Sequence, residues 1–429
     1  MKRFVRAAFT ASLLCATAGA SSVLWAAAAQ AADKAEKVSA AVGKPLSEAQ
    51  KAIATKDYAT ALADIKLAQA VPDHTPIDDY RINQFLSIVA FNLKDIPTAT
   101  TAIQAAADSP VIPPEEKTDI YTNALILSVA SQQYQKAVTY GQYLAALGPL
   151  SAEQDMRMAI SYFNLKDTPH AQEFAQKSID AAKAAGTQPN PDMLRIVLNG
   201  QAQQNDRSGA EASLESLVLA DPDNAATSWR DLVNLAFGEK GAGEIDAIFL
   251  YRLKVLAGAM TDADDYTTLA STDEQLGYPT EAVNVLEKGV ASGKLSGGQA
   301  GDLLSRSRKD SALDARELPE AVASAEKSKS GEQSVKLGED YWGYGRFADA
   351  EAAARRAIAK GGLKKPAEGN LLLGATLVAQ AKYEEAIQTF GQINGTPATM
   401  KVAHLWTLYA EGKQKKAPAT AAPAPAPAQ

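Results

Sequence analysis

Two seven-residue strings that match at six positions occur in this chain of 429 residues and limit what the chain can fold into. The first copy reads Phe-Asn-Leu-Lys-Asp-Ile-Pro from Phe91, and the second reads Phe-Asn-Leu-Lys-Asp-Thr-Pro from Phe163, 72 positions later. An offset of this size equals two units of a helical-hairpin repeat, because such units are about 34–40 residues long. The sequence therefore predicts a tandem array of similar units.

A four-residue pattern recurs through most of the chain. Its first copy is Tyr58, Ala61, Ile65 and Ala68, and steps of 3, 4 and 3 place these residues on one stripe of a helix. The second position is always alanine, and a small residue there lets two helices approach closely. These anchor alanines are Ala61, Ala99, Ala137, Ala171, Ala210, Ala282, Ala350 and Ala386. Period-2 runs, which would predict strands, are nearly absent.

Two long intervals between anchor alanines predict further units. The steps from Ala210 to Ala282 and from Ala282 to Ala350 are 72 and 68 residues, twice the usual spacing. Ala247 and Ala321 are the candidates for the missing anchors, although their surroundings fit the pattern poorly. The sequence thus predicts about ten repeats.

This pattern resembles the tetratricopeptide repeat (TPR), and the last two units carry the best matches. The matching residues are Leu337, Gly338, Tyr341, Gly345, Phe347, Ala350, Ala354 and Ala357, followed by Leu373, Gly374, Tyr383, Ala386 and Phe390. The resemblance covers most of residues 45–412 and weakens over 223–330. It implies an all-α fold, an α-α superhelix (solenoid) of about ten TPR-like helical hairpins whose first helices line a concave groove. A single hairpin cannot bury its apolar face alone, so neighbouring units must cover it.

Composition shifts and turn residues divide the chain into predicted segments. These are a signal peptide at 1–31, a flexible linker at 32–44, N-terminal TPR-like repeats at 45–222, degenerate helical repeats at 223–330, C-terminal repeats with a capping helix at 331–412, and a disordered Pro/Ala-rich tail at 413–429. The capping helix is expected to bury one stripe, formed by Met400, Ala403, Trp406 and Tyr409.

The N-terminus has the features of a secretory signal. Lys2, Arg3 and Arg6 precede a long apolar run, and Ala-Gln-Ala before position 32 predicts cleavage after Ala31. The run is also long enough for an uncleaved membrane anchor. Cleavage changes the net charge from −7 to −10 because three basic residues leave. We therefore expect an acidic periplasmic protein with no nucleic-acid partner and no membrane span after cleavage.

The sequence predicts no catalytic, cofactor-binding or metal-binding residue. The only cysteine, Cys15, lies in the signal, and the three histidines are far apart in the chain. Ser324 and Lys327 have the Ser-x-x-Lys spacing of some hydrolases, but the other motifs of those enzymes are missing. Residues 262–265 (Asp-Ala-Asp-Asp) resemble the opening of a calcium loop, yet lack its glycine and its closing glutamate, so we expect a helix start there.

Residues on the first helices of the hairpins are the candidates for partner binding. They are Arg81, Gln84, Phe91 and Asn92 in the second unit, Phe163 and Asn164 in the fourth, and Glu339 and Trp342 in the ninth. A repeated asparagine suits peptide capture, because an amide both donates to and accepts from a peptide backbone. Two alternatives stay open here. Duplication alone explains shared residues, and Trp342 is alternatively a core residue, because aromatic residues on repeat helices are more often core.

These observations favour a non-enzymatic scaffold of the bacterial cell envelope that needs no cofactor and binds a protein or peptide through the concave face of a TPR superhelix. The alternative is a periplasmic module that binds a small molecule or glycan through the irregular central region, 223–330. A third hypothesis is an unrecognised hydrolase. The sequence gives no identity for the partner.

Overall fold

The computed structural model describes residues 37–222 and 224–416. The predicted signal peptide with its cleavage site and Cys15, and residues 417–429 of the predicted tail, lie outside the described residues. The described part contains twenty α-helices and one short 3-10 helix, and it contains no strand. The predicted all-α fold is confirmed.

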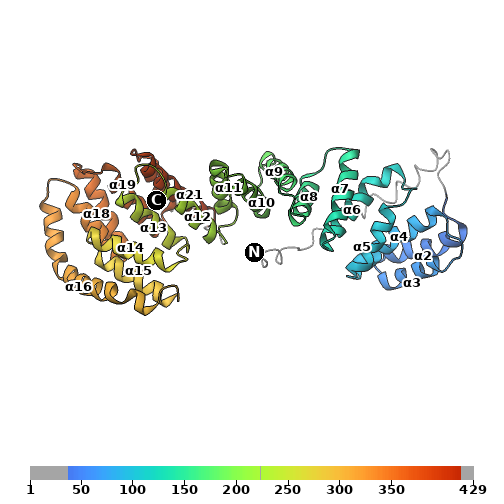
Figure 1. Cartoon of the computed structure of the whole chain (residues 1–429), viewed down its shortest axis with the longest axis horizontal. Helices are drawn as coiled ribbons and strands as arrows, with labels where there is room; N and C mark the ends of the chain where they lie inside the picture. Colours follow the sequence, from blue (N-terminus) through green and yellow to red (C-terminus); the bar gives the residue numbers. More distant parts are fainter. Residues whose placement is uncertain (1–36, 223, 417–429) are drawn as a thin grey trace, which may run out of the picture. The chain divides into compact units, whose positions relative to one another are not determined.

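The chain divides into two units, one ending at Leu150 and the other beginning at Ser151, and each is described by itself. Unit 1 consists of three helical hairpins (Figure 1). Its helices are α2 (Ala40–Ala54), α3 (Tyr58–Gln69), α4 (Pro76–Asn92), α5 (Ile96–Ala107), α6 (Lys117–Ala130) and α7 (Tyr134–Leu147), with the 3-10 helix η2 (Pro114–Glu116) before α6. The domain boundaries predicted at 222 and 330 stay predictions.

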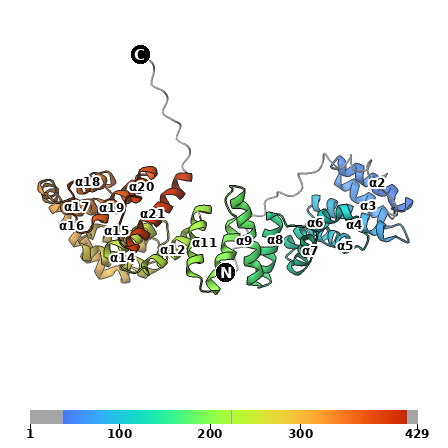
Figure 2. The ribbon, with the colours of Figure 1, turned by 90° about the horizontal axis from the view of Figure 1, so that it is seen from above.

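Unit 2 contains six hairpins and two single helices. The hairpins are α8 (Ala152–Asn164) with α9 (Thr168–Ala184), α10 (Pro191–Gln203) with α11 (Arg207–Ala220), α12 (Ala226–Phe237) with α13 (Glu244–Leu256), α14 (Ala263–Leu276) with α15 (Pro279–Ala291), α17 (Glu332–Gly343) with α18 (Phe347–Lys360), and α19 (Pro366–Ala379) with α20 (Tyr383–Phe390). The single helices are α16 (Gly297–Lys327) and α21 (Pro397–Lys416). Figure 2 shows successive hairpins of each unit lying side by side.

The turn inside most hairpins has one conformation. The residue two positions before the second helix is left-handed, as Lys94 shows with a φ of 63°. The next backbone N–H then bonds the carbonyl five residues earlier, as Asp95 does to Ala90 at 2.8 Å, which closes the end of the first helix. The left-handed residues are Lys56, Lys94, Gln132, Lys166, Asn205, Gly277, Gly345 and Ala381. In four hairpins an aspartate then caps the second helix through its side chain: Asp57, Asp95, Asp167 and Asp206.

The anchor alanines occupy the positions that the pattern predicts. Each is the fourth residue of the second helix of its hairpin. All are fully buried except Ala210, which is half-buried. Ala247 is likewise the fourth residue of α13, and it supplies one of the two missing anchors. At these buried positions the two helices of a hairpin leave room for a methyl group, and a larger side chain would push the helices apart.

The prediction for Ala321 is wrong. This residue lies inside α16, a single helix of 31 residues where the spacing predicted a hairpin. Residues 302–327 contain neither glycine nor asparagine, so no residue there favours the left-handed turn that ends the other first helices. The described chain therefore has nine hairpins instead of about ten.

Both predicted flexible ends begin or stop within helix. Ser39 caps α2 through its side chain and Val42 is fully buried, so residues 40–44 of the predicted linker are helical. At the other end, α21 continues to Lys416, and the first residues of the predicted tail are helical as well.

The last helix, α21, contacts two sets of helices that are far apart in the sequence. α21 packs against α19 and α20, and it also packs against α11, α12 and α13. Ala403, Trp406 and Tyr409 are buried, as the predicted stripe requires, whereas Met400 is 52% exposed. Among the described residues, no helix combines the length and apolar character that a membrane span needs.

Candidate functional site

One stripe of α4 in unit 1 carries the predicted partner-binding residues. Arg81, Gln84, Ile88 and Phe91 follow one another in steps of 3, 4 and 3, and each is at least partly exposed. Ile88 is 37% exposed although it is apolar. Asn92, one position further, is exposed at the end of the helix. The structure thus brings these residues together on one helix face.

Glu116, a residue that the sequence did not single out, fixes the polar end of this stripe. Its Oε2 accepts hydrogen bonds from Arg81 at 2.7 Å, from Gln84 at 3.0 Å and from the hydroxyl of Tyr80 at 2.7 Å. Burial would raise the pKa of Glu116, but these donors outweigh burial and hold the pKa below its usual range. Glu116 ends η2, in a loop without periodicity, so no sequence pattern marked it.

The matching stripe of unit 2 lies on α8. Ile160, Phe163 and Asn164 are partly exposed there, as their counterparts are on α4. Each of the two repeated asparagines donates its amide to the carbonyl four residues earlier, Asn92 to Ile88 and Asn164 to Ile160, both at 2.8 Å. These amide donors therefore stabilise the ends of their own helices, which gives the repeated asparagine a structural role. The phenylalanines have no such local contact with their backbone.

Glu339 and Trp342 lie elsewhere, in the interior of unit 2. They are 1% and 8% exposed, so neither lines an open groove in this structure, and Trp342 is the core residue that the sequence left as an alternative. Arg252 of α13, also buried, binds Glu281 of α15 through Nε at 2.8 Å and Nη2 at 2.5 Å. Its Nη1 lies 2.5 Å from Oε2 of Glu339.

Aromatic rings complete this buried cluster. The guanidinium carbon of Arg252 lies 4.9 Å from the ring centre of Trp342 and 5.1 Å from that of Phe249. The indole N–H of Trp342 donates to Glu281 Oε1 at 3.0 Å. The sequence held one overlooked signal, because the cations Arg252 and Lys254 interrupt the otherwise apolar run 248–256.

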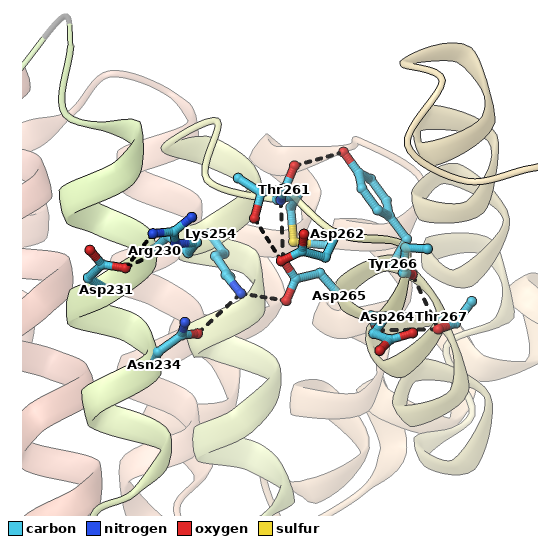
Figure 3. Close-up of polar contacts among 12 residues, drawn as sticks. Arg230, Asp231, Asn234, Lys254, Thr261, Asp262, Asp264, Asp265, Tyr266 and Thr267 are labelled. Atoms are coloured by element: carbon cyan, nitrogen blue, oxygen red, sulfur yellow. Dashed lines mark hydrogen bonds and ion pairs between the residues drawn. The ribbon is translucent and has the colours of Figure 1, made fainter. Parts of the chain in front are cut away.

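A second buried cation lies on the same helix (Figure 3). Lys254 donates to Asp265 at 2.5 Å and to Asn234 at 3.3 Å. Asp262, at the start of α14, accepts from the hydroxyl of Thr261 at 3.0 Å. The acidic run at 262–265 therefore begins a helix, as expected, and Asp265 also pairs with the buried Lys254. In the described part of the chain, no three His, Cys, Asp or Glu side chains are grouped so as to hold a metal ion.

The Ser-x-x-Lys pair lies at the surface. Ser324 and Lys327 line a shallow depression of about 520 Å³ with Glu320, Ala323, Ser328 and Gln333. Both residues are exposed.

The repeated geometry decides the architecture. Each second helix has an alanine at its fourth position, buried in all hairpins except those of Ala210 and Ala247, and most hairpin turns share the left-handed residue. The chain is an array of TPR-like hairpins. No family model matches the chain, and no curated protein matches it.

Three of the solved structures that match this chain cover most of its length. The apo form of RapI is 11% identical, with a TM-score of 0.31, and the match covers 74% of this chain and 97% of RapI. A chain of the Naa15/Naa10 complex bound to HypK-THB is 14% identical, with a TM-score of 0.33 and coverage of 83% and 65%. The TPR domain of P58(IPK) is 12% identical, with a TM-score of 0.24 and coverage of 87% and 98%. These likenesses supply neither a partner nor a function for this chain.

Proposed function

We propose that this chain is a non-enzymatic scaffold that is exported to the periplasm of a bacterium and binds a protein or peptide there. In unit 1 the proposed contact residues are those of the α4 stripe (Arg81, Gln84, Ile88 and Phe91), and in unit 2 they are Ile160 and Phe163 of the α8 stripe. The observation that carries this proposal is the partial exposure of the same apolar pair, isoleucine and phenylalanine, on one helix of each unit. Apolar side chains left at the surface in matching positions are typical of contact surfaces.

The net charge of the mature chain favours some classes of partner over others. The mature chain carries a net charge of −10 if the three basic residues of the signal are removed from a total of −7. Like charges repel over the surface, so a basic or neutral partner is favoured over an acidic one. Glu339 and Trp342 are not part of the proposed surface, because both are buried.

Site-specific photocrosslinking in the cell envelope tests the proposed surface. A photoreactive residue replaces Ile88 in one variant and Ile160 in another, and a third variant carries it at Leu67, an apolar residue of α3 that is 62% exposed. We expect the same protein to be crosslinked from positions 88 and 160 and not from 67. The double variant Phe91→Ala and Phe163→Ala should lose the crosslink while circular dichroism stays unchanged. Equal crosslinking from all three positions would contradict the proposal.

Export and the absence of catalysis need separate tests. Mass spectrometry of the mature protein from an envelope fraction should give a chain that begins at Ala32, and retention of residues 1–31 would favour the membrane-anchored alternative. A broad hydrolase screen should show no activity. Activity that disappears in Ser324→Ala would replace the scaffold proposal with the hydrolase hypothesis.

A further inference from the structure

Helices α13, α14, α15 and α17 of unit 2 enclose more acidic than basic side chains. One guanidinium, Arg252, shares the interior with three carboxyl groups, Asp273, Glu281 and Glu339. All four side chains are between 0 and 6% exposed. If every group were ionised, the interior would hold two uncompensated negative charges. Such charges are strongly disfavoured away from water, and a buried acid normally takes up a proton instead.

The contacts show which acid is the candidate for that proton. Glu281 accepts two hydrogen bonds from Arg252 and one from Trp342, so these donors stabilise its ionised form. Glu339 lies against the remaining terminal nitrogen of Arg252. The oxygens of Asp273 and of Glu339 have no hydrogen-bond partner, but Asp273, which is fully buried, also lacks the ion pair that Glu339 makes with Arg252. Asp273 is therefore the carboxyl group whose negative charge is compensated least.

We propose that Asp273 is a neutral, protonated acid in folded unit 2 at neutral pH, and that loss of this proton loosens the packing of α14 against α13 and α15. Unit 2 then contains a pH-sensitive switch in its interior. The reaction is a simple ionisation in which the proton passes to solvent and the carboxylate remains in the protein. This switch needs no ligand. It acts on α13 and α15, whose residues Arg252 and Glu281 contact Trp342.

The groups that face Asp273 agree with this assignment. They are Arg252 on α13, Glu281 on α15, Glu339 on α17 and Glu274 on its own helix. Arg306 of α16 lies 3.7 Å from Glu274 and compensates that residue. Burial raises the pKa of Asp273 well above its usual value, the charges of Glu281, Glu339 and Glu274 add to the rise, and Arg252 opposes it.

The sign of the pH effect follows from this shift. The folded chain holds the Asp273 proton at pH values where the unfolded chain has released it. The stability is therefore fully present below the ordinary aspartate pKa and falls as pH rises toward the folded-state pKa. Glu339 changes in the same direction, because burial raises its pKa to about 7. Asp340, on the same helix, also has a pKa of about 7 because of burial and the charge of Asp314.

Urea unfolding of the full chain between pH 6 and pH 9, followed by tryptophan fluorescence, tests the switch. Trp229, Trp342 and Trp406, which are the tryptophans among the described residues, all lie in unit 2. We expect the wild-type midpoint to fall as pH rises. Asp273→Asn imitates the protonated acid. In this variant the pH dependence of the unfolding free energy should correspond to about one bound proton fewer than in the wild type, and the urea midpoint at pH 9 should be higher. Equal slopes in the wild type and the variant would overturn the proposal.

Asp264→Asn is the matched control, because it makes the same change at an exposed acid of the same helix. Its slope should equal that of the wild type, and an equally reduced slope would show that the effect is not specific to Asp273. A second measurement needs no variant. Infrared spectra of the folded wild type should contain the C=O band of a protonated carboxylic acid at about pH 8, where Glu339 and Asp340 are mostly ionised, and this band should fade at more alkaline pH. Absence of that band would overturn the proposal even if Asp273→Asn fails to fold.

Discussion

The indole nitrogen of Trp406 donates a hydrogen bond of 3.0 Å to the backbone carbonyl of Phe249, 157 residues earlier in the chain. Trp406 is fully buried, and its ring lies 5.9 Å from that of Phe390. The hydroxyl of Tyr409 makes a second such bond to the carbonyl of Leu256 at 3.0 Å. Two side chains of α21 thus satisfy carbonyls of α13, so the last helix is tied to the middle of the array.

Replacing Trp406 with phenylalanine should destabilise unit 2 by about 2–4 kcal/mol. The change removes the indole hydrogen bond to the Phe249 carbonyl, which costs about 0.5–1.5 kcal/mol, and the smaller ring also leaves a void. Urea unfolding followed by circular dichroism measures the loss. Thr407→Val on the same helix is the control, because it removes only a bond of 2.9 Å to the carbonyl of Ala403 within α21. If both variants lose the same unfolding free energy, the hydrogen bond from α21 to α13 does not contribute measurably to stability.

Ala137→Leu should destabilise unit 1 by about 1–3 kcal/mol through overpacking. Ala137 is fully buried as the fourth residue of α7, where it faces the partner helix α6. Thermal unfolding followed by circular dichroism provides the measurement. Ala145→Leu makes the same change at an exposed position of α7 and should be nearly neutral. A neutral result for Ala137→Leu would show that the anchor position tolerates a larger side chain.

The hairpins could be predicted from the sequence because their signals are local. An alanine at a fixed place in a stripe, a turn residue and a cap lie within about ten residues of one another, as in Lys94, Asp95 and Ala99. Even in the degenerate region, Ala247 keeps the fourth position of its helix, although its hairpin lacks the common turn. Within α16 the turn signal is missing, and even spacing alone gave the wrong prediction for Ala321.

The interior of unit 2 could not be predicted, because its contacts join distant helices. Glu339 looks like a groove residue from its repeat position, but the packing of α17 against α15 and α19 buries it beside Arg252. Repeat periodicity records how each hairpin meets its neighbour and carries no information on such contacts. Glu116 was missed for a different reason, since it stands in a short 3-10 helix with no repeating pattern.

The left-handed turn residues give a prediction about the backbone. Gln132 is exposed and has a φ of 59°, which side chains with a Cβ adopt at a cost. Gln132→Gly should therefore stabilise unit 1 by about 0.5–1 kcal/mol after the entropy of glycine is subtracted. Chemical unfolding by circular dichroism is the measurement, and Gln132→Ala, which keeps the strain, should be neutral.

Gly345 provides the reverse experiment. Its φ is 68°, and a Cβ added there would meet no atom within 4 Å, so the cost of Gly345→Ala comes from the backbone alone. We expect a loss of about 1 kcal/mol in unit 2. If neither this variant nor Gln132→Gly shifts the unfolding midpoint, the turn conformation is not under the strain that its φ angles indicate.

The ion pairs between α11 and α21 should make unit 2 sensitive to acid. Glu215 of α11 accepts hydrogen bonds from His404 at 2.9 Å and from Lys401 at 3.0 Å. The bond from His404 lowers the pKa of Glu215 to about 2, against the effect of burial and with further help from Lys401. Because the folded-state pKa lies below the unfolded value, this stabilisation is present above about pH 4.5 and is lost as pH falls toward 2.

Glu215→Gln tests this relationship. At pH 6 the variant should be less stable than the wild type by about 1–2 kcal/mol, because two charge-assisted hydrogen bonds are weakened. The difference should shrink steadily as pH falls below 4.5, since the wild type is then protonated at the same position and resembles the amide. Urea midpoints from tryptophan fluorescence at pH 6, 5, 4 and 3 give the profile. Glu384→Gln, at an exposed acid of α20, should show no such convergence. A constant difference at all pH values would mean that Glu215 stabilises the contact between α11 and α21 by packing and not by its charge.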